Sequence, residues 1–208
     1  MSRIVLRLSN RRNRGIRRRV NVTMLWAVFG LLIGLCQMQE PLARFGTTVV
    51  RSVGFRGEVY LLPPGTAKLP KFSKLHSLGA IYATSLNVPP TDFSEGFPGV
   101  TGRFECFAID YIGRFWIKRP GKYRFALLSD DGSKLYIDGR VVIDNDGVHP
   151  PQLQTGHVAL KSGFHQIRIS YFQGPRYQVA LVLSIAGPGE EFRVFNADEF
   201  IPPPNSQD

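Results

Sequence analysis

The 208-residue chain has few cysteines and histidines, and this scarcity excludes several kinds of site. It contains two Cys and four His. Two Cys cannot build the multi-disulfide framework of a small secreted domain or a four-cysteine zinc site. The G-x-S-x-G, H-E-x-x-H and P-loop motifs are also absent from the sequence. We therefore predict that the protein is not an enzyme of these classes, and that it is not an enzyme at all.

The folded part of the chain also lacks an excess of charge of either sign. The formal net charge is +10, but residues 1–19 hold eight Arg and no acidic residue. Residues 57–208 hold 15 basic and 15 acidic residues, and so are neutral. Binding of nucleic acid requires a basic face on the folded domain. We therefore predict that nucleic acid is not a partner.

Long apolar runs are absent except near the N-terminus. Residues 20–37 contain an uninterrupted apolar run from Met24 to Cys36, directly after the arginine-rich head. A basic flank before an apolar run places the N-terminus in the cytoplasm. We predict a cytoplasmic head over 1–19 and a transmembrane signal-anchor helix over 20–37, followed by a linker over 38–56. A cleaved signal peptide is the alternative, because the run is short for a membrane span.

This topology predicts where the rest of the chain lies. With an uncleaved anchor, the protein is held in the membrane through residues 20–37, and its domain faces the periplasm or the cell exterior. With a cleaved segment, the protein is secreted.

Strand patterns dominate the sequence after the linker. Lys122–Ser129 and Phe164–Phe172 alternate between apolar and polar residues, and similar short segments recur every 8–12 residues with turn residues between them. Asp138-Gly139 between two short apolar runs predicts a hairpin with a type I′ turn. The fold class is therefore all-β, an antiparallel sandwich or barrel over 57–187, preceded by one N-terminal apolar helix. Residues 188–208 are predicted to be a C-terminal tail.

The most informative stretch is acidic. Leu127–Gly147 contains five Asp residues together with Asn145. Carboxylates on loops between strands are hard oxygen ligands, which suit calcium. Asp-Gly pairs are also good turn formers, so the same residues are explained by turn chemistry alone. The residues leave both interpretations open.

At these residues the chain resembles a known family. GRFWIKRPGKYRFALLSDDGSKLYIDGRVVIDNDG over 113–147, followed by GHVALKSGFHQIRISYFQGPRYQVALVL over 156–183, is similar to the PA-14 domain. This β-barrel module occurs in anthrax protective antigen, fungal flocculins and adhesins, and some glycosidases. The resemblance covers roughly 57–187 and implies a binding module, often one for carbohydrate.

The resemblance also implies a site. In the adhesin branch two adjacent Asp, joined by a cis peptide bond, hold a calcium ion whose coordination sugar hydroxyls complete. The matching residues here are Asp130 and Asp131, which become the candidate metal ligands. An Asn from a later loop also binds the metal in that branch, whereas the comparable loop here offers Gln173 and no Asn. Further candidate ligand-binding residues are Asp144, Asn145, Asp146, Gln173 and Tyr177.

Two functions follow as expectations. The first is a membrane-anchored, envelope-facing module that binds carbohydrate, with calcium as its candidate cofactor. The alternative is a structural or protein-interaction module of a cell-envelope assembly, with an envelope protein as partner and no metal.

Overall fold

The computed structural model describes residues 54–92, 97–100, 105–174 and 178–204. The predicted head (1–19), the apolar segment (20–37) and all but the end of the linker (38–56) lie outside these residues, so the predicted N-terminal helix is not part of the described structure. Within the described ranges, no helix is both long and apolar enough to span a bilayer.

The larger sheet contains six antiparallel strands in the order β2-β1-β4-β9-β6-β7. Its strands are β1 (Gly54–Leu61), β2 (Ser77–Ala83), β4 (Phe107–Ile117), β6 (Ser133–Ile137), β7 (Arg140–Asn145) and β9 (Gly163–Gln173). A short 3-10 helix, η1 (Phe72–Lys74), lies between β1 and β2. The long β4–β9 ladder, unbroken from Phe107 opposite Gln173 to Ile117 opposite Gly163, forms the middle of this sheet.

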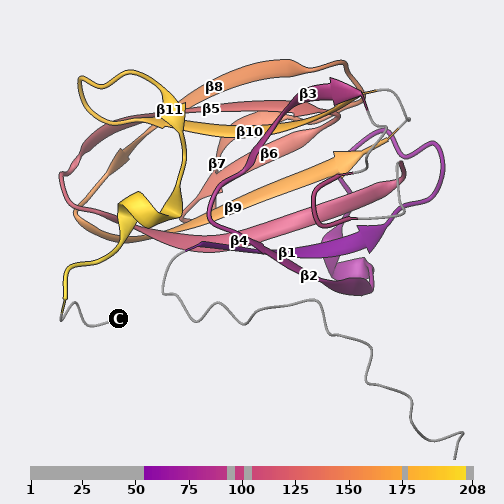
Figure 1. The fold of residues 1–208 in the computed structure, drawn as a ribbon, viewed down its shortest axis with the longest axis horizontal. Coiled ribbons are helices and arrows are strands. Elements are labelled where there is room, and N and C mark those ends of the chain that lie inside the picture. The colour runs from indigo at the N-terminus through magenta and orange to yellow at the C-terminus, as the bar shows by residue number, and fades with distance from the viewer. Residues whose placement is uncertain (1–53, 93–96, 101–104, 175–177, 205–208) are drawn as a thin grey trace, which may run out of the picture. The chain divides into compact units, whose positions relative to one another are not determined.

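The smaller sheet has the order β11-β10-β5-β8, and β3 pairs with β10 off this path. Its strands are β3 (Asn87–Asp92), β5 (Gly121–Asp130), β8 (Gln152–Leu160), β10 (Gln178–Ala186) and β11 (Arg193–Val194). In Figure 1 the two sheets lie face to face as two layers. Together they confirm the predicted all-β antiparallel class.

Aromatic and branched aliphatic side chains fill the space between the sheets. Phe115 of β4 meets Phe125 of β5 edge to face, with ring centroids 6.4 Å apart. Both residues are fully buried, as are Leu135 and Ile167. These side chains occupy alternate positions of their strands, because successive side chains of a strand point to opposite faces.

The Asp138-Gly139 hairpin is confirmed. It joins β6 to β7, and both residues have positive φ angles, 50° and 76°. A type I′ turn requires positive φ at both central positions, which explains the preference for Asp-Gly there.

The segment predicted as a C-terminal tail contributes to the core. Within 188–208 lie β11 and a 3-10 helix, η2 (Ala197–Phe200). Phe195 and Phe200 stack at a centroid distance of 5.0 Å, and both are buried. The folded domain therefore extends beyond residue 187. It also begins before residue 57, since β1 starts at Gly54.

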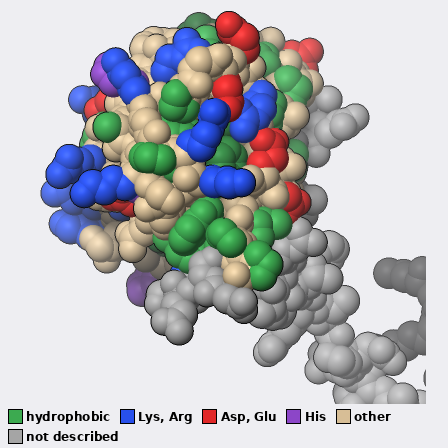
Figure 2. All heavy atoms as spheres, turned by 90° about the vertical axis from the view of Figure 1, so that its left-hand side faces the viewer, with side chains coloured by type: hydrophobic (Ala, Val, Ile, Leu, Met, Phe, Trp, Pro, Cys, Tyr) green, Lys and Arg blue, Asp and Glu red, His purple; other side chains and the backbone are tan. Residues whose placement is uncertain are grey.

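Charged side chains at the end where β9 begins form a mixed surface. Figure 2 shows this end, the left-hand side of Figure 1, with Lys and Arg among acidic and hydrophobic side chains. Arg119, in the β4–β5 connection, pairs with Glu190 at 2.9 Å. Arg193 pairs with Glu190 at 3.0 Å and with Glu199 at 2.8 Å. The cations of this network are thus neutralised locally.

Candidate functional site

The two candidate metal ligands lie where four strands end or begin at one edge of the domain. Asp130 is the last residue of β5, and Asp131 and Gly132 connect it to β6. Ser133, the first residue of β6, pairs with Asn145 at the end of β7 and with Tyr171 near the end of β9. This edge is the one at which β9 ends, marked by its arrowhead in Figure 1.

Asp130 and Asp131 form a buried pair of carboxylates. Only 6% of Asp130 and 3% of Asp131 is exposed. The peptide bond between them is cis, as the family resemblance implies. Neither carboxylate forms an ion pair with a Lys or Arg in the described part of the chain. Buried carboxylates are normally paired with a cation or bound to a metal.

Backbone N–H groups from two other loops hold the Asp131 carboxylate. Its Oδ2 accepts a hydrogen bond from the Gly174 N–H at 2.7 Å, and its Oδ1 accepts one from the His149 N–H at 3.1 Å. Each carboxylate oxygen has lone pairs beyond the one used here. Asp131 therefore fixes the end of β9 against the β7–β8 loop and still has oxygen lone pairs for a ligand.

Asp130 is positioned by Tyr171 and Gln173. The Tyr171 hydroxyl lies 2.7 Å from the Asp130 carbonyl oxygen and 2.6 Å from Gln173 Oε1, so its single proton is placed between two acceptors. Burial, and next the negative charge of Asp131, raises the pKa of the Asp130 carboxyl from 3.8 to about 6. Burial likewise raises the pKa of Asp131, against the effect of its two N–H donors. The groups around the pair therefore do not fully stabilise the ionised form of either carboxyl.

Gly132 is required by the close approach of two loops. A Cβ at this position would lie 2.4 Å from Cε1 of Phe172, 2.7 Å from the Gly147 nitrogen and 2.9 Å from the Gly147 oxygen. Glycine thus allows the 130–132 turn to pack directly on the loop that contains Gly147.

The other predicted acidic ligands are held by Lys134. Its Nζ lies 3.1 Å from Asp144 Oδ2 and 3.4 Å from Asp146 Oδ2. Asp146 Oδ1 also accepts a hydrogen bond from the Leu69 N–H at 2.7 Å. In this structure both carboxylates therefore hold loops in place.

The predicted amide ligands are bonded inside the protein as well. The Asn145 amide donates to Ser129 Oγ and to the Gln152 carbonyl oxygen, both at 3.0 Å. The Gln173 amide donates to the Gln178 carbonyl oxygen at 3.1 Å, and the side chain is fully buried. Tyr177 lies outside the described residues.

Replacing Asn145 with Ala is expected to lower the free energy of unfolding by about 1–3 kcal/mol, because the buried Ser129 hydroxyl and the partly buried Gln152 carbonyl lose a donor. Thermal or urea denaturation measures this. Asp144→Ala is the control: its ion pair is exposed, so the expected cost is at most about 1 kcal/mol. Equal costs for both variants would contradict the role given to Asn145.

The raised pKa of Asp130 predicts a pH-dependent stability in metal-free solution. The folded state keeps this proton between about pH 4 and pH 6, while the unfolded state has lost it, so the free energy of unfolding falls as the pH rises through this window. We expect this contribution to fall by about 1–2 kcal/mol, allowing for partial solvent screening, and to level off above about pH 7. Urea denaturation of wild type and Asp130→Asn isolates this contribution, and parallel pH profiles would contradict it.

Three supporting residues could not be found by their spacing. Tyr171, Gly174 and the His149 backbone reach the Asp pair only after β9 pairs with β6 and the β7–β8 loop folds back. Of these residues, only His149 had a signal in the sequence, because it lies close to the acidic stretch.

The side chains at this edge supply some, but not all, of the oxygen ligands that a calcium ion requires. Within the described ranges, no three His, Cys, Asp or Glu side chains are grouped so as to hold a metal. Calcium takes six to eight oxygen ligands, which include carbonyls and water as well as carboxylates. Two adjacent carboxylates, which have no Lys or Arg partner in the described residues, supply the charged part of such a set.

The PA14 domain family model matches residues 68–194, which is more than half of the chain. The chain belongs to the PA14 domain family. No curated protein matches its sequence.

Solved structures have the same fold as this PA14 domain at low sequence identity. The PA14 domain of the MpAFP antifreeze protein gives a TM-score of 0.61 at 18% identity, over 75% of this chain and 94% of that one. The PA14 sugar-binding domain of an RTX adhesin gives 0.56 at 17% identity, over 71% and 97%. The epithelial adhesin 9 A domain of Candida glabrata, solved with Galβ1-3GlcNAc, gives 0.53 at 16% identity, over 72% and 88%.

A larger protein also contains this fold. An anti-sigma factor domain-containing protein gives a TM-score of 0.57 at 19% identity over 75% of this chain, and this chain spans 50% of its length.

Proposed function

We propose that this PA14 domain binds carbohydrate through a calcium ion held by Asp130 and Asp131. The observation that carries the proposal is the buried carboxylate pair, which has no Lys or Arg partner in the described residues. Two solved relatives support the ligand class: one is a sugar-binding domain of an adhesin, and the other was solved with a galactose-containing disaccharide.

Different residues of this chain would have different roles at the site. Calcium, when bound, supplies positive charge and open coordination positions to which sugar hydroxyls bind. The N–H groups of Gly174 and His149 fix the rotamer of Asp131, so its free lone pairs point in a set direction. Tyr171, held beside Gln173, fixes the backbone at Asp130. Pre-oriented ligands lower the entropy lost on binding.

The proposal includes the setting of the domain. The head over 1–19 and the apolar segment over 20–37 favour a membrane-anchored chain whose domain faces the periplasm or the cell exterior. A module at this location would meet glycans of the cell envelope or of another cell. We propose binding without turnover.

A second function, a metal-free structural module that binds an envelope protein, is favoured by one observation. Asp144, Asn145 and Asp146 are all bonded to groups of the protein itself. In that function the acidic turns serve the shape of the domain, and Asp130 and Asp131 do the same.

A glycan array probed with the full chain distinguishes the two functions. Carbohydrate binding through calcium predicts binding to a subset of glycans in about 2 mM calcium, and loss of that binding with excess chelator. Absence of binding to every glycan in calcium, together with chelator-resistant crosslinking to one envelope protein, would support the structural module instead.

A further inference from the structure

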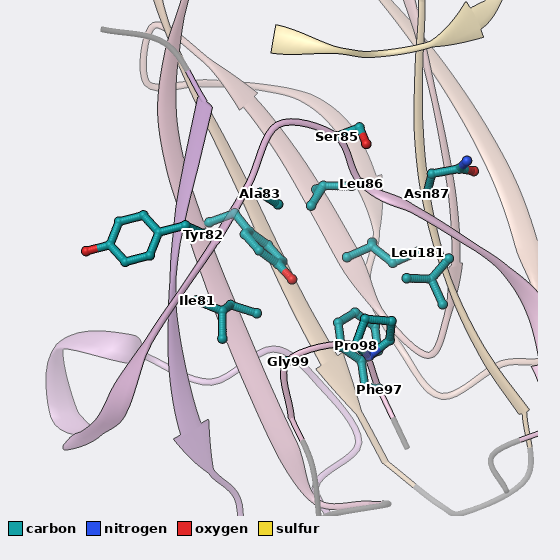
Figure 3. Close-up of a pocket in the computed structure, with 12 residues that line it drawn as sticks. Ile81, Tyr82, Ala83, Ser85, Leu86, Asn87, Phe97, Pro98, Gly99 and Leu181 are labelled. Atoms are coloured by element: carbon teal, nitrogen blue, oxygen red, sulfur yellow. The ribbon is translucent and has the colours of Figure 1, made fainter. Parts of the chain in front are cut away.

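A cavity of about 210 Å³ lies between the two sheets, beside the connection from β2 to β3. Ile81, Leu86, Phe97 and Pro98 lie around it in Figure 3, whereas Tyr82 points away. Its remaining walls are Ala83, Ser85, Asn87, Val88, Gly99, Tyr111 and Leu181. The lining is mostly apolar and comes from both sheets.

Tyr111 is the buried polar residue of this lining, in which Ser85 and Asn87 also carry polar groups. Only 2% of Tyr111 is exposed, and its hydroxyl makes no hydrogen bond with any residue of the described structure. No fully buried side-chain polar atom in the described ranges lacks a partner, so the Tyr111 hydroxyl has some accessible surface, and Tyr111 lines the cavity. Burial raises the pKa of Tyr111 with no hydrogen bond or charge acting against it. The group is therefore a neutral donor and acceptor without a partner among the described residues.

The Tyr111 ring is fixed in place. It meets Phe55 edge to face, with centroids 6.3 Å apart. On another side it packs against Gly57, where a Cβ would lie 2.6 Å from the ring. Because the ring has little room to turn, its hydroxyl keeps a fixed position at the cavity.

We infer that this cavity is a binding site for a small, mostly apolar molecule, about the size of a substituted benzene ring, that carries one hydrogen-bonding atom. An apolar cavity of about 150 Å³ engineered in another protein binds benzene, so 210 Å³ accommodates a ring with a short substituent. Such an atom would take the place of water as the hydrogen-bond partner of the Tyr111 hydroxyl. A sugar is excluded, because most of its hydroxyls would be buried against carbon.

This site is separate from the proposed carbohydrate site. The Phe97 ring lines the cavity and stacks on Tyr171, with centroids 5.3 Å apart, so these rings stand between the cavity and the Asp130 backbone. The ligand contacts no carboxylate of the Asp pair. Failure of one site therefore does not imply failure of the other.

Two probes of equal shape test the inference: benzyl alcohol, which has the polar atom, and ethylbenzene, which has a methyl group in its place. We expect the full chain to bind both at millimolar concentration or below, with NMR shift changes at the cavity residues. At ligand concentrations about 100 times Kd, the thermal midpoint should rise by roughly 5–10 °C. Absence of any shift with either probe would overturn the inference.

Variants identify the hydroxyl as the recognition element. Tyr111→Phe should weaken benzyl alcohol binding by about 5-fold and leave ethylbenzene binding unchanged or tighter. Ala83→Ile, which fills the cavity, should abolish binding of both probes. Tyr123→Phe is the matched control, because its hydroxyl already donates to the Arg119 carbonyl at 2.8 Å. Equal effects of Tyr111→Phe on both probes would overturn the role of the hydroxyl.

Asp130→Asn separates the two sites. It should leave benzyl alcohol binding unchanged, because Asp130 does not line the cavity. Loss of benzyl alcohol binding in this variant would contradict the separation of the cavity from the Asp pair.

Discussion

Replacing Asp130 with Asn is expected to abolish the calcium binding that we propose while leaving the protein folded. The carboxyl is destabilised in its charged form by burial and by Asp131, and its pKa of about 6 reflects this. A neutral amide of the same shape removes that repulsion, so in chelator at pH 7 the variant should be as stable as wild type or more stable. The calcium affinity that we propose should fall by at least roughly 100-fold, because one of the two proposed charged oxygen ligands is lost.

Isothermal titration with calcium and thermal denaturation with and without chelator measure both effects. Asp138→Asn is the matched control, since it makes the same change in the β6–β7 turn at the opposite end of the domain, and Asn-Gly also forms type I′ turns. A variant at Asp130 that loses stability in chelator and binds calcium as wild type does would show that this carboxylate serves the fold instead.

Gly132→Ala is expected to lower the free energy of unfolding by about 3 kcal/mol, at the upper end of the cost of overpacking. The added Cβ would lie 2.4 Å from the Phe172 ring and 2.7 Å from the Gly147 nitrogen. A ring can shift slightly, but the backbone of Gly147 belongs to the loop that the turn must contact. The substitution should therefore also move Asp131 and weaken the proposed calcium binding.

Urea denaturation tests this, with Gly139→Ala as control. Gly139 has a φ of 76° but nothing within 4 Å of an added Cβ, so it measures the cost of the backbone conformation without a clash. That cost is about 1–2 kcal/mol. If Gly132→Ala cost less than Gly139→Ala, the close packing of the two loops would not be what requires glycine at 132.

Most strands could be predicted from local patterns because they have one buried face. Alternation located β5 and β9, and Asp-Gly located the turn between β6 and β7. Two strands had no such signal: β3 contains Pro89 and Pro90, and β11 has only two residues. Both are held by pairing with β10, which is a long-range contact that local periodicity does not contain.

The candidate site could be predicted only at the level of composition. The adjacent Asp130 and Asp131 were found from the sequence. However, the sequence does not distinguish an acidic residue that binds a ligand from one that pairs with a lysine of the same protein. Asp144 and Asp146 flank Lys134 because β6 and β7 pair in a register that places Lys134 opposite Asp144. Similarly, Gln173 is buried because the β4–β9 ladder extends to its position opposite Phe107.

Isothermal titration of the wild-type full chain with calcium at pH 7 is the most direct test of the central claim that Asp130 and Asp131 hold a metal. The proposal predicts one ion per chain with a dissociation constant between about 10⁻⁶ and 10⁻³ M. It further predicts that this binding disappears in Asp130→Asn. Absence of calcium binding up to about 10 mM, well above that range, would contradict the proposal and leave the pair as part of the scaffold.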